Sequence, residues 1–118
     1  MRVLLVGEKQ EPKVLSILHS LAVFQELVGG TIEIVEPFDD DVVLICNENA
    51  RCDGKPVNRI INEHLDVCGD FFLCGSSESD LTDIPEEKAF KYASLFRVPQ
   101  SNPEEQVVSD RPWYQILS

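Results

Sequence analysis

The feature that most constrains this chain is a pair of apolar segments separated by a short, strongly acidic stretch. Thr31–Glu36 and Asp41–Cys46 are both rich in β-branched and other apolar side chains, which is typical of strands. Between them, Pro37-Phe38 and the adjacent carboxylates of Asp39 and Asp40 provide turn chemistry. The sequence therefore predicts a β-hairpin with an acidic tip.

Further segments complete the predicted architecture. Apolar runs predict strands at Arg2–Val6 and at Asp70–Cys74, and Gly75-Ser76-Ser77 is expected to end the second of these. A helix is predicted over Asp83–Arg97 because its apolar residues recur at helical spacing, whereas Lys55–Arg59 contains a proline and is expected to be irregular. These elements predict an α+β fold, a compact single domain with a mainly antiparallel small sheet and two helices.

The segment between the first strand and Gly29-Gly30 permits two interpretations. Its apolar residues fall at helical spacing, and Pro12 suits the first turn of one long helix. Alternatively, Lys13–Ile17 is a second strand and a short helix follows Ser20 as its N-cap. In both cases the helix ends at the glycine pair, because glycine readily adopts the left-handed conformation.

Length and charge limit the classes of function. A chain of 118 residues is long enough for one domain, which we place at residues 1–98, with residues 99–118 as a C-terminal tail that docks or is mobile.

The chain has 21 acidic and 10 basic residues and a formal net charge of −11. Such a surface repels nucleic acid and anionic membranes, so we expect neither as a direct partner. Without a signal peptide or membrane span, we expect a cytoplasmic location.

The four cysteines have a paired spacing that resembles a zinc site only superficially. They form the pairs Cys46-x5-Cys52 and Cys68-x5-Cys74, whereas zinc-ligand pairs usually lie two to four residues apart. Two of the four end apolar strands, where a free cysteine behaves as a small buried hydrophobe. We therefore predict thiols, with no bound metal and no cofactor.

The acidic tip is the other candidate for a metal. Asp39, Asp40 and Asp41, together with Glu36 or Glu48, could offer oxygen ligands to magnesium or calcium. The alternating acids, central glycine and distal glutamate of a calcium loop are absent, and adjacent strand residues point to opposite faces. The expected role of the tip is a solvated turn that discourages pairing between sheet edges.

Asn58 and Arg59 are the first candidates for ligand binding. An arginine beside an asparagine in an irregular segment suits recognition of a carboxylate, a phosphate or a backbone. The alternative is a structural arginine that ties this segment to the acidic tip. Asn47 and Glu48, which follow the hairpin, and the acids Asp39–Asp41 complete the candidate ligand-binding set.

Two aromatic residues near the C-terminus are the candidates for a partner contact. Trp113 and Tyr114 are expected to dock onto the protein's own core, or to mediate a homo-oligomer or capture by a partner.

The sequence contains few candidate catalytic residues. His64 and Cys68 would be neighbours on a helix, but no third group is evident to orient them, and no catalytic motif occurs. We therefore predict that the protein is not an enzyme.

Several short blocks of the sequence resemble a known protein family. In chain order they are Leu27-Val28-Gly29-Gly30, Ile32-Glu33, Pro37-Phe38-Asp39-Asp40-Asp41, Cys46-Asn47-Glu48, Gly54, Pro56, Asn58-Arg59 and Gly69-Asp70-Phe71-Phe72-Leu73-Cys74-Gly75. On these blocks the chain resembles a domain-of-unknown-function family of small proteins from phages, plasmids and conjugative elements of Gram-positive bacteria. The resemblance spans residues 1–97 and favours the strand, rather than the long helix, before Ser20.

The resemblance implies a setting rather than a chemistry. Small acidic accessory proteins of mobile elements often act in host takeover or counter-defence by stoichiometric binding. We therefore expect a non-enzymatic binding protein that occupies a host protein or sequesters a small-molecule ligand. The alternatives are a metal-dependent hydrolase that uses Asp39–Asp41 and an antirestriction-type inhibitor that mimics DNA.

Overall fold

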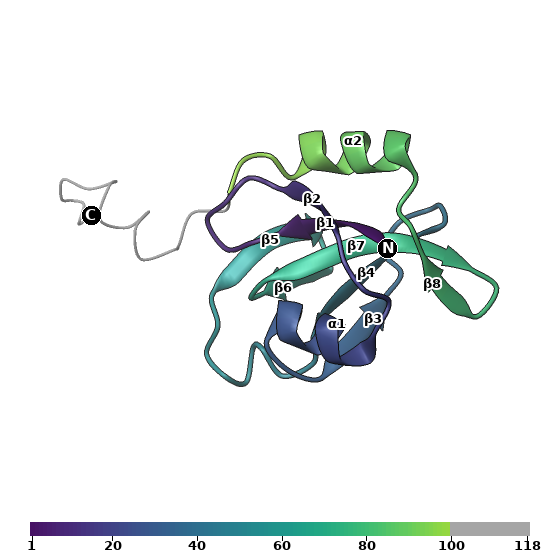
Figure 1. The fold of residues 1–118 in the computed structure, drawn as a ribbon. Helices are drawn as coiled ribbons and strands as arrows, with labels where there is room; N and C mark the ends of the chain where they lie inside the picture. Colours follow the sequence, from purple (N-terminus) through teal and green to yellow (C-terminus); the bar gives the residue numbers. More distant parts are fainter. Residues whose placement is uncertain (100–118) are drawn as a thin grey trace, which may run out of the picture.

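A computed structural model describes residues 1–99 and contains a six-stranded sheet, a separate two-stranded hairpin and two helices (Figure 1). The elements are β1 (Arg2–Val6), β2 (Lys13–Ser16), α1 (Leu21–Val28), β3 (Ile32–Val35), β4 (Val42–Asn47), β5 (Val57–Asn62), β6 (Leu65–Cys68), β7 (Phe71–Ser77), β8 (Asp80–Thr82) and α2 (Glu86–Leu95). The large sheet has the order β2-β1-β7-β4-β3, and β8 pairs with the end of β7. Every pair is antiparallel, which confirms the predicted α+β class.

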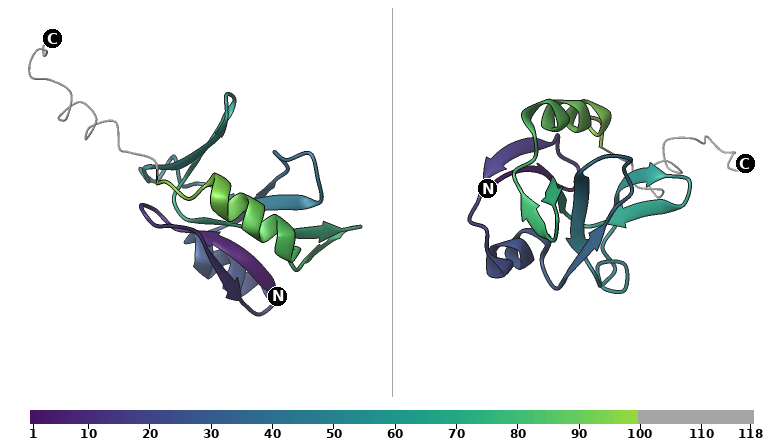
Figure 2. Two further views of the ribbon diagram at one scale, coloured as in Figure 1. Left: turned by 90° about the horizontal axis from the view of Figure 1, so that it is seen from above. Right: turned by 90° about the vertical axis from the view of Figure 1, so that its right-hand side faces the viewer.

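The two helices cover opposite faces of the large sheet (Figure 2). Because side chains alternate along a strand, β4 and β7 contribute to both cores. On the α1 side, Phe72 packs with Phe24, whose ring centroid is 5.7 Å away. On the α2 side, Phe71 packs with Phe96 at 6.2 Å. The central strands are buried on both faces, which explains why their sequences are continuous apolar runs.

The structure selects the second interpretation of the segment before Gly29. β2 (Lys13–Ser16) pairs with β1, and Ser20 then precedes α1 in an extended conformation, with φ −150°. Gly29 ends the helix in the left-handed conformation, with φ 81°, and its N–H donates to the carbonyl of Gln25. No helix among residues 1–99 is long and apolar enough to cross a membrane.

Three boundary predictions were wrong. Lys55–Arg59 is not irregular throughout, since Val57 begins a hairpin of β5 and β6. The strand over Asp70–Cys74 does not end at Gly75 but continues to Ser77, because it pairs there with β4 and β8. The second helix begins at Glu86 rather than Asp83, because the preceding residues cross from β8 to α2 and bond to β1.

Gly75 is required where the chain crosses from β8 to α2. A Cβ atom at this position would lie 2.3 Å from the carbonyl oxygen of Asp83 and 2.7 Å from Oγ1 of Thr82. The crossing is fixed on its other side by Arg2, whose Nε donates to the carbonyl of Ile84 at 2.9 Å. The close approach of the two backbones therefore depends on the missing side chain.

Candidate functional site

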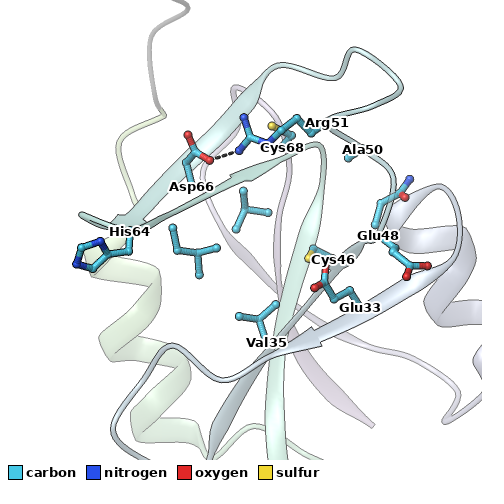
Figure 3. Close-up of a pocket in the computed structure, with 12 residues that line it drawn as sticks. Glu33, Val35, Cys46, Glu48, Ala50, Arg51, His64, Asp66 and Cys68 are labelled. Carbon is cyan, nitrogen blue, oxygen red and sulfur yellow. Dashed lines mark hydrogen bonds and ion pairs between the residues drawn. The ribbon is translucent and has the colours of Figure 1, made fainter.

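A groove of about 320 Å³ lies between the β3–β4 strands and the β5–β6 hairpin (Figure 3). The hairpin turns over the α2 face of the sheet and packs Val67 into the same core as Leu44. The lining residues come from both sides of the gap and are Glu33, Val35, Cys46, Asn47, Glu48, Ala50, Arg51, His64, Leu65, Asp66, Val67 and Cys68. The volume is at the lower end of the range of small-molecule sites.

The groove is apolar in part and acidic at its rim. Val35, Leu65 and Val67 contribute apolar surface. Arg51 and Asp66 form an ion pair across one end (Figure 3). Glu33 and Glu48 are exposed and have no ion-pair partner within residues 1–99. The groove therefore offers two free carboxylates beside an apolar surface.

The two groove thiols are poorly suited to chemistry. Burial, with a smaller effect from the carboxylate of Glu33 and from Cys68, raises the pKa of Cys46 to about 11. Burial also raises the pKa of Cys68, although nearby Arg51 opposes the shift. Both thiols are therefore protonated near neutral pH, whereas a nucleophile or a metal ligand must be the thiolate.

His64 and Cys68 are not helical neighbours. They lie on the β5–β6 hairpin, His64 in its turn and Cys68 at the end of β6, and they are well separated in Figure 3. The His64 side chain is 88% exposed, and its Nε2 lies 3.6 Å from Oε1 of Glu63. Within residues 1–99, no group of three or more His, Cys, Asp and Glu side chains is arranged to hold a metal ion.

Asn58 and Arg59 lie outside the groove and use their polar atoms within the fold. Asn58 Nδ2 donates to the carbonyls of Val6 (2.8 Å) and Gly69 (2.9 Å). Arg59 donates to the carbonyls of Phe96 (3.0 Å) and Gln10 (2.6 Å), and to both Asn58 oxygens. Both side chains are buried, so they join β5 to the sheet and to the end of α2. Their predicted ligand-binding role stays a prediction.

Arg59 is a buried cation whose partners are carbonyl and amide oxygens. Burial lowers the pKa of Arg59, because removing the guanidinium from water disfavours its charged form. Within residues 1–99 it has no ion pair, so the anticipated tie to the acidic tip is not made. The planar guanidinium directs its N–H donors in fixed directions toward these four acceptors. A lysine ammonium cannot reproduce that arrangement of donors.

The acidic tip docks on α2 through two of its residues. Phe38 packs on Tyr92 with ring centroids 4.4 Å apart. Asp40 accepts hydrogen bonds from the Tyr92 hydroxyl (2.7 Å) and the Val42 amide (3.0 Å), and its Oδ2 lies 3.2 Å from Lys88 Nζ. Asp39 and Asp41, in contrast, are exposed and do not line the groove. The three carboxylates therefore have different environments.

The contacts of Asp40 determine its titration. Burial raises the pKa of Asp40, but hydrogen bonds from Tyr92 and Val42 and the charge of Lys88 outweigh that effect and hold the pKa below its ordinary value of 3.8. A depressed folded-state pKa stabilises the protein above the unfolded-state pKa, and that contribution is lost as the pH falls through the folded-state pKa. The Asp40 contribution is therefore complete at neutral pH.

Asp40→Asn is expected to lower the free energy of unfolding by about 1 kcal/mol at neutral pH, because it removes the charge that Lys88 and the Tyr92 hydroxyl face. The difference from wild type should shrink as the pH falls below the ordinary carboxyl pKa of 3.8, because the unfolded chain takes up its proton there first and folded Asp40 does so only at lower pH. Urea denaturation at pH 7 and pH 3 measures both values. Asp39→Asn is the control, with little effect at either pH. A difference for Asp40→Asn that did not vary with pH would contradict this account.

Two of the predicted ligand-binding residues line the groove, namely Asn47 and Glu48. The amide of Asn47 is used by the fold, since Nδ2 donates to the carbonyl of Val28 and Oδ1 accepts from the Asn49 amide. Glu48 is the member of the set that is both exposed and in the groove. Trp113 and Tyr114 lie outside the described residues.

Sequence reasoning missed most of the groove. Arg51 and Asp66 belong to no recognisable motif, and Glu33 is one residue of a block that carries the family resemblance. The available signal was the pair of apolar segments around Ile60 and Val67 separated by polar turn residues, which indicates a second hairpin.

Comparison with family models matches residues 1–97 to the family described as Domain of unknown function (DUF3846). Comparison with curated proteins and with solved structures gave no match. The matched range includes β1 to α2 and therefore every strand of the groove. The chain belongs to this domain-of-unknown-function family.

Proposed function

We propose that this is a small acidic binding protein of a phage or mobile element, which acts without catalysis in host takeover or counter-defence. It occupies a host protein or sequesters a small ligand, and the groove between β3–β4 and β5–β6 is its binding site. The observation that carries this proposal is the combination of apolar surface with the free carboxylates of Glu33 and Glu48 in one groove of about 320 Å³.

The chemistry of the groove favours binding over catalysis. Its two thiols are held in the neutral form, and the histidine at its edge extends into solvent. A nucleophile needs an adjacent base, and that base needs an orienting group. The apolar surface and the rim carboxylates, in contrast, are what a ligand with an apolar part and a cationic part requires.

The biological setting rests on the family resemblance and on charge. The blocks that carry the resemblance include Cys46-Asn47-Glu48, which contributes directly to the groove. With a net charge of −11, the protein attracts basic partners over long range and speeds their association. A stoichiometric inhibitor benefits from fast association, because it must reach its target before the target acts.

Reversing the charge of the groove is expected to weaken specific capture of a partner. The tagged protein and Glu33→Lys/Glu48→Lys are incubated with host lysate, and the proteins and small molecules retained are quantified by mass spectrometry. The wild type should retain a defined partner, and the variant should retain at least about tenfold less of it, which corresponds to about 1.4 kcal/mol. Circular dichroism checks that the variant is folded.

The matched control is Asp39→Lys/Asp41→Lys. It changes the net charge by the same amount, also at exposed carboxylates, but these lie outside the groove. Retention of the partner by this control, together with its loss from the groove variant, supports the proposal. An equal loss from both variants would mean that net charge alone attracts the partner, and the groove would then not be the site.

A further inference from the structure

The outer edge of β3 is open to another strand. Among residues 1–99, β3 is the last strand of the sheet and pairs with β4 only. The Glu48 amide donates to the Thr31 carbonyl at 2.8 Å, which identifies Thr31 as a residue whose backbone groups face β4. Hydrogen bonding alternates along an antiparallel strand, so Glu33 also faces β4, whereas the N–H and C=O of Ile32 and Ile34 point outward.

The open edge and the groove are parts of one surface. Glu33 and Val35 project from β3 into the groove, whereas Ile34 projects from the other face and is 51% exposed. A strand added along this edge would place alternate side chains beside Glu33, at the groove, and the intervening side chains beside Ile34. The surface therefore favours a cationic residue at one position and an apolar residue at the next.

Charge argues against a second copy of this chain as the occupant. If two β3 edges paired antiparallel through Ile32 and Ile34, the Glu33 side chains of the two copies would lie directly opposite each other. Like charges in this position are destabilising, and opposite charges are stabilising. The edge therefore suits a strand that carries a positive side chain opposite Glu33.

The second edge of the sheet has a different character. The β2 edge carries Lys13 and contributes no residue to the groove. Addition of a basic strand there would meet a like charge. Of the strands β2 and β3, which end the strand order of the sheet, only β3 combines outward backbone groups with a residue that lends a carboxylate to the groove.

We propose that the groove and the β3 edge bind an extended segment of a partner protein that carries lysine or arginine at alternate positions. This proposal rests on the proposed function and names the partner's chemistry. The segment adds to the sheet by hydrogen bonds with the outward groups of Ile32 and Ile34, as in other cases of strand addition. Its cationic side chains lie at Glu33 and Glu48, and its alternate apolar side chains cover Ile34.

Synthetic peptides test this directly. The probe is a fluorescent eight-residue peptide of alternating lysine and valine, with two analogues that are N-methylated at every valine or at every lysine. In an antiparallel addition, the valines oppose Ile32 and Ile34 and exchange hydrogen bonds with them, so N-methyl-valine should weaken binding at least about tenfold and N-methyl-lysine little. In a parallel addition, Ile32 and Ile34 would bond to the neighbouring lysines instead, so N-methyl-lysine would be the analogue that binds weakly. The charge is the same in all three peptides.

The protein offers a second readout. Hydrogen exchange of the Ile32 and Ile34 amides should slow at least about tenfold when the parent peptide binds, because both donors become bonded. Ile34→Pro removes an outward donor and spares the bonds to β4, so it should weaken binding by a similar factor, whereas Ile34→Thr keeps the donor. Thermal melts confirm that both variants are folded.

Binding that is equal for all three peptides would show attraction by charge alone and would overturn strand addition. If no peptide binds, yet Glu33→Lys/Glu48→Lys still loses its partner from lysate, the inference about strand addition fails while the groove remains the binding site. If the groove variant also retains its partner, the proposed function fails as well.

Discussion

Replacing Arg59 with methionine is expected to lower the free energy of unfolding by about 3 kcal/mol. The guanidinium donates to the carbonyls of Phe96 and Gln10 and to both oxygens of Asn58, and all these atoms are in or near the protein interior. Methionine fills much of the volume but leaves buried acceptors without donors. These hydrogen bonds join β5 to the end of α2. Their loss is therefore expected to destabilise the β5–β6 hairpin, which forms one wall of the groove.

Arg59→Lys is the informative comparison. Lysine keeps the charge, but its single ammonium cannot reach acceptors that lie on three different segments. We expect at least about 2 kcal/mol of destabilisation from this formally conservative change. Urea denaturation followed by circular dichroism measures both variants. Arg97→Met, at an exposed arginine, is the control and should be close to wild type. A lysine variant of wild-type stability would show that charge, not the fork geometry, matters.

Gly75→Ala is expected to destabilise the protein by about 3 kcal/mol. The new methyl group would lie 2.3 Å from the Asp83 carbonyl oxygen, and neither backbone can yield easily. Gly75 pairs with Val42 of β4 and Thr82 of β8, while Asp83 leads into α2. Relief of the clash must therefore displace either the β8 pairing or the helix.

The matched control is Gly7→Ala. Gly7 is also buried, but its added Cβ would meet the Gln10 side chain at 3.2 Å, which is a flexible group that can turn away. The loss at this position should be below about 1 kcal/mol. Denaturation measures the two variants, and amide exchange of β8 locates the damage. Equal losses at the two glycines would contradict the role of the β8–α2 crossing.

The β3–β4 hairpin was predictable because its strand residues follow simple rules. Val42 to Cys46 is an uninterrupted apolar run, and the turn carries proline and aspartates. The β5–β6 hairpin was missed because its register shifts between Val57 and Arg59 and again between Ile60 and Asn62. These bulges break the period of two, so that adjacent Asn58 and Arg59 are both buried. A segment that lacks the alternation of buried and exposed residues is typical of a loop rather than a strand.

The groove was harder to predict than the fold, because one of its walls is the β5–β6 hairpin. It exists because the missed hairpin folds over the sheet, so residues with no shared sequence pattern, such as Glu33 and Asp66, line one hollow. Glu48 is a candidate because of its carboxylate, and it does line the groove. Arg59 is a candidate because of its guanidinium, but sequence alone does not reveal that carbonyl groups from three segments surround it.

The position of β7 has a consequence for how the chain assembles. β7 lies between β1 and β4, yet it is synthesised after both. The β1–β2 and β3–β4 hairpins are local and can form early, but the contacts that unite them are long-range and therefore slow. Until Phe71 to Ser77 inserts between them, each hairpin exposes an apolar, unpaired edge. We expect chains that end before β7 to aggregate rather than fold in part, so that insertion of this one strand commits the domain to its native state.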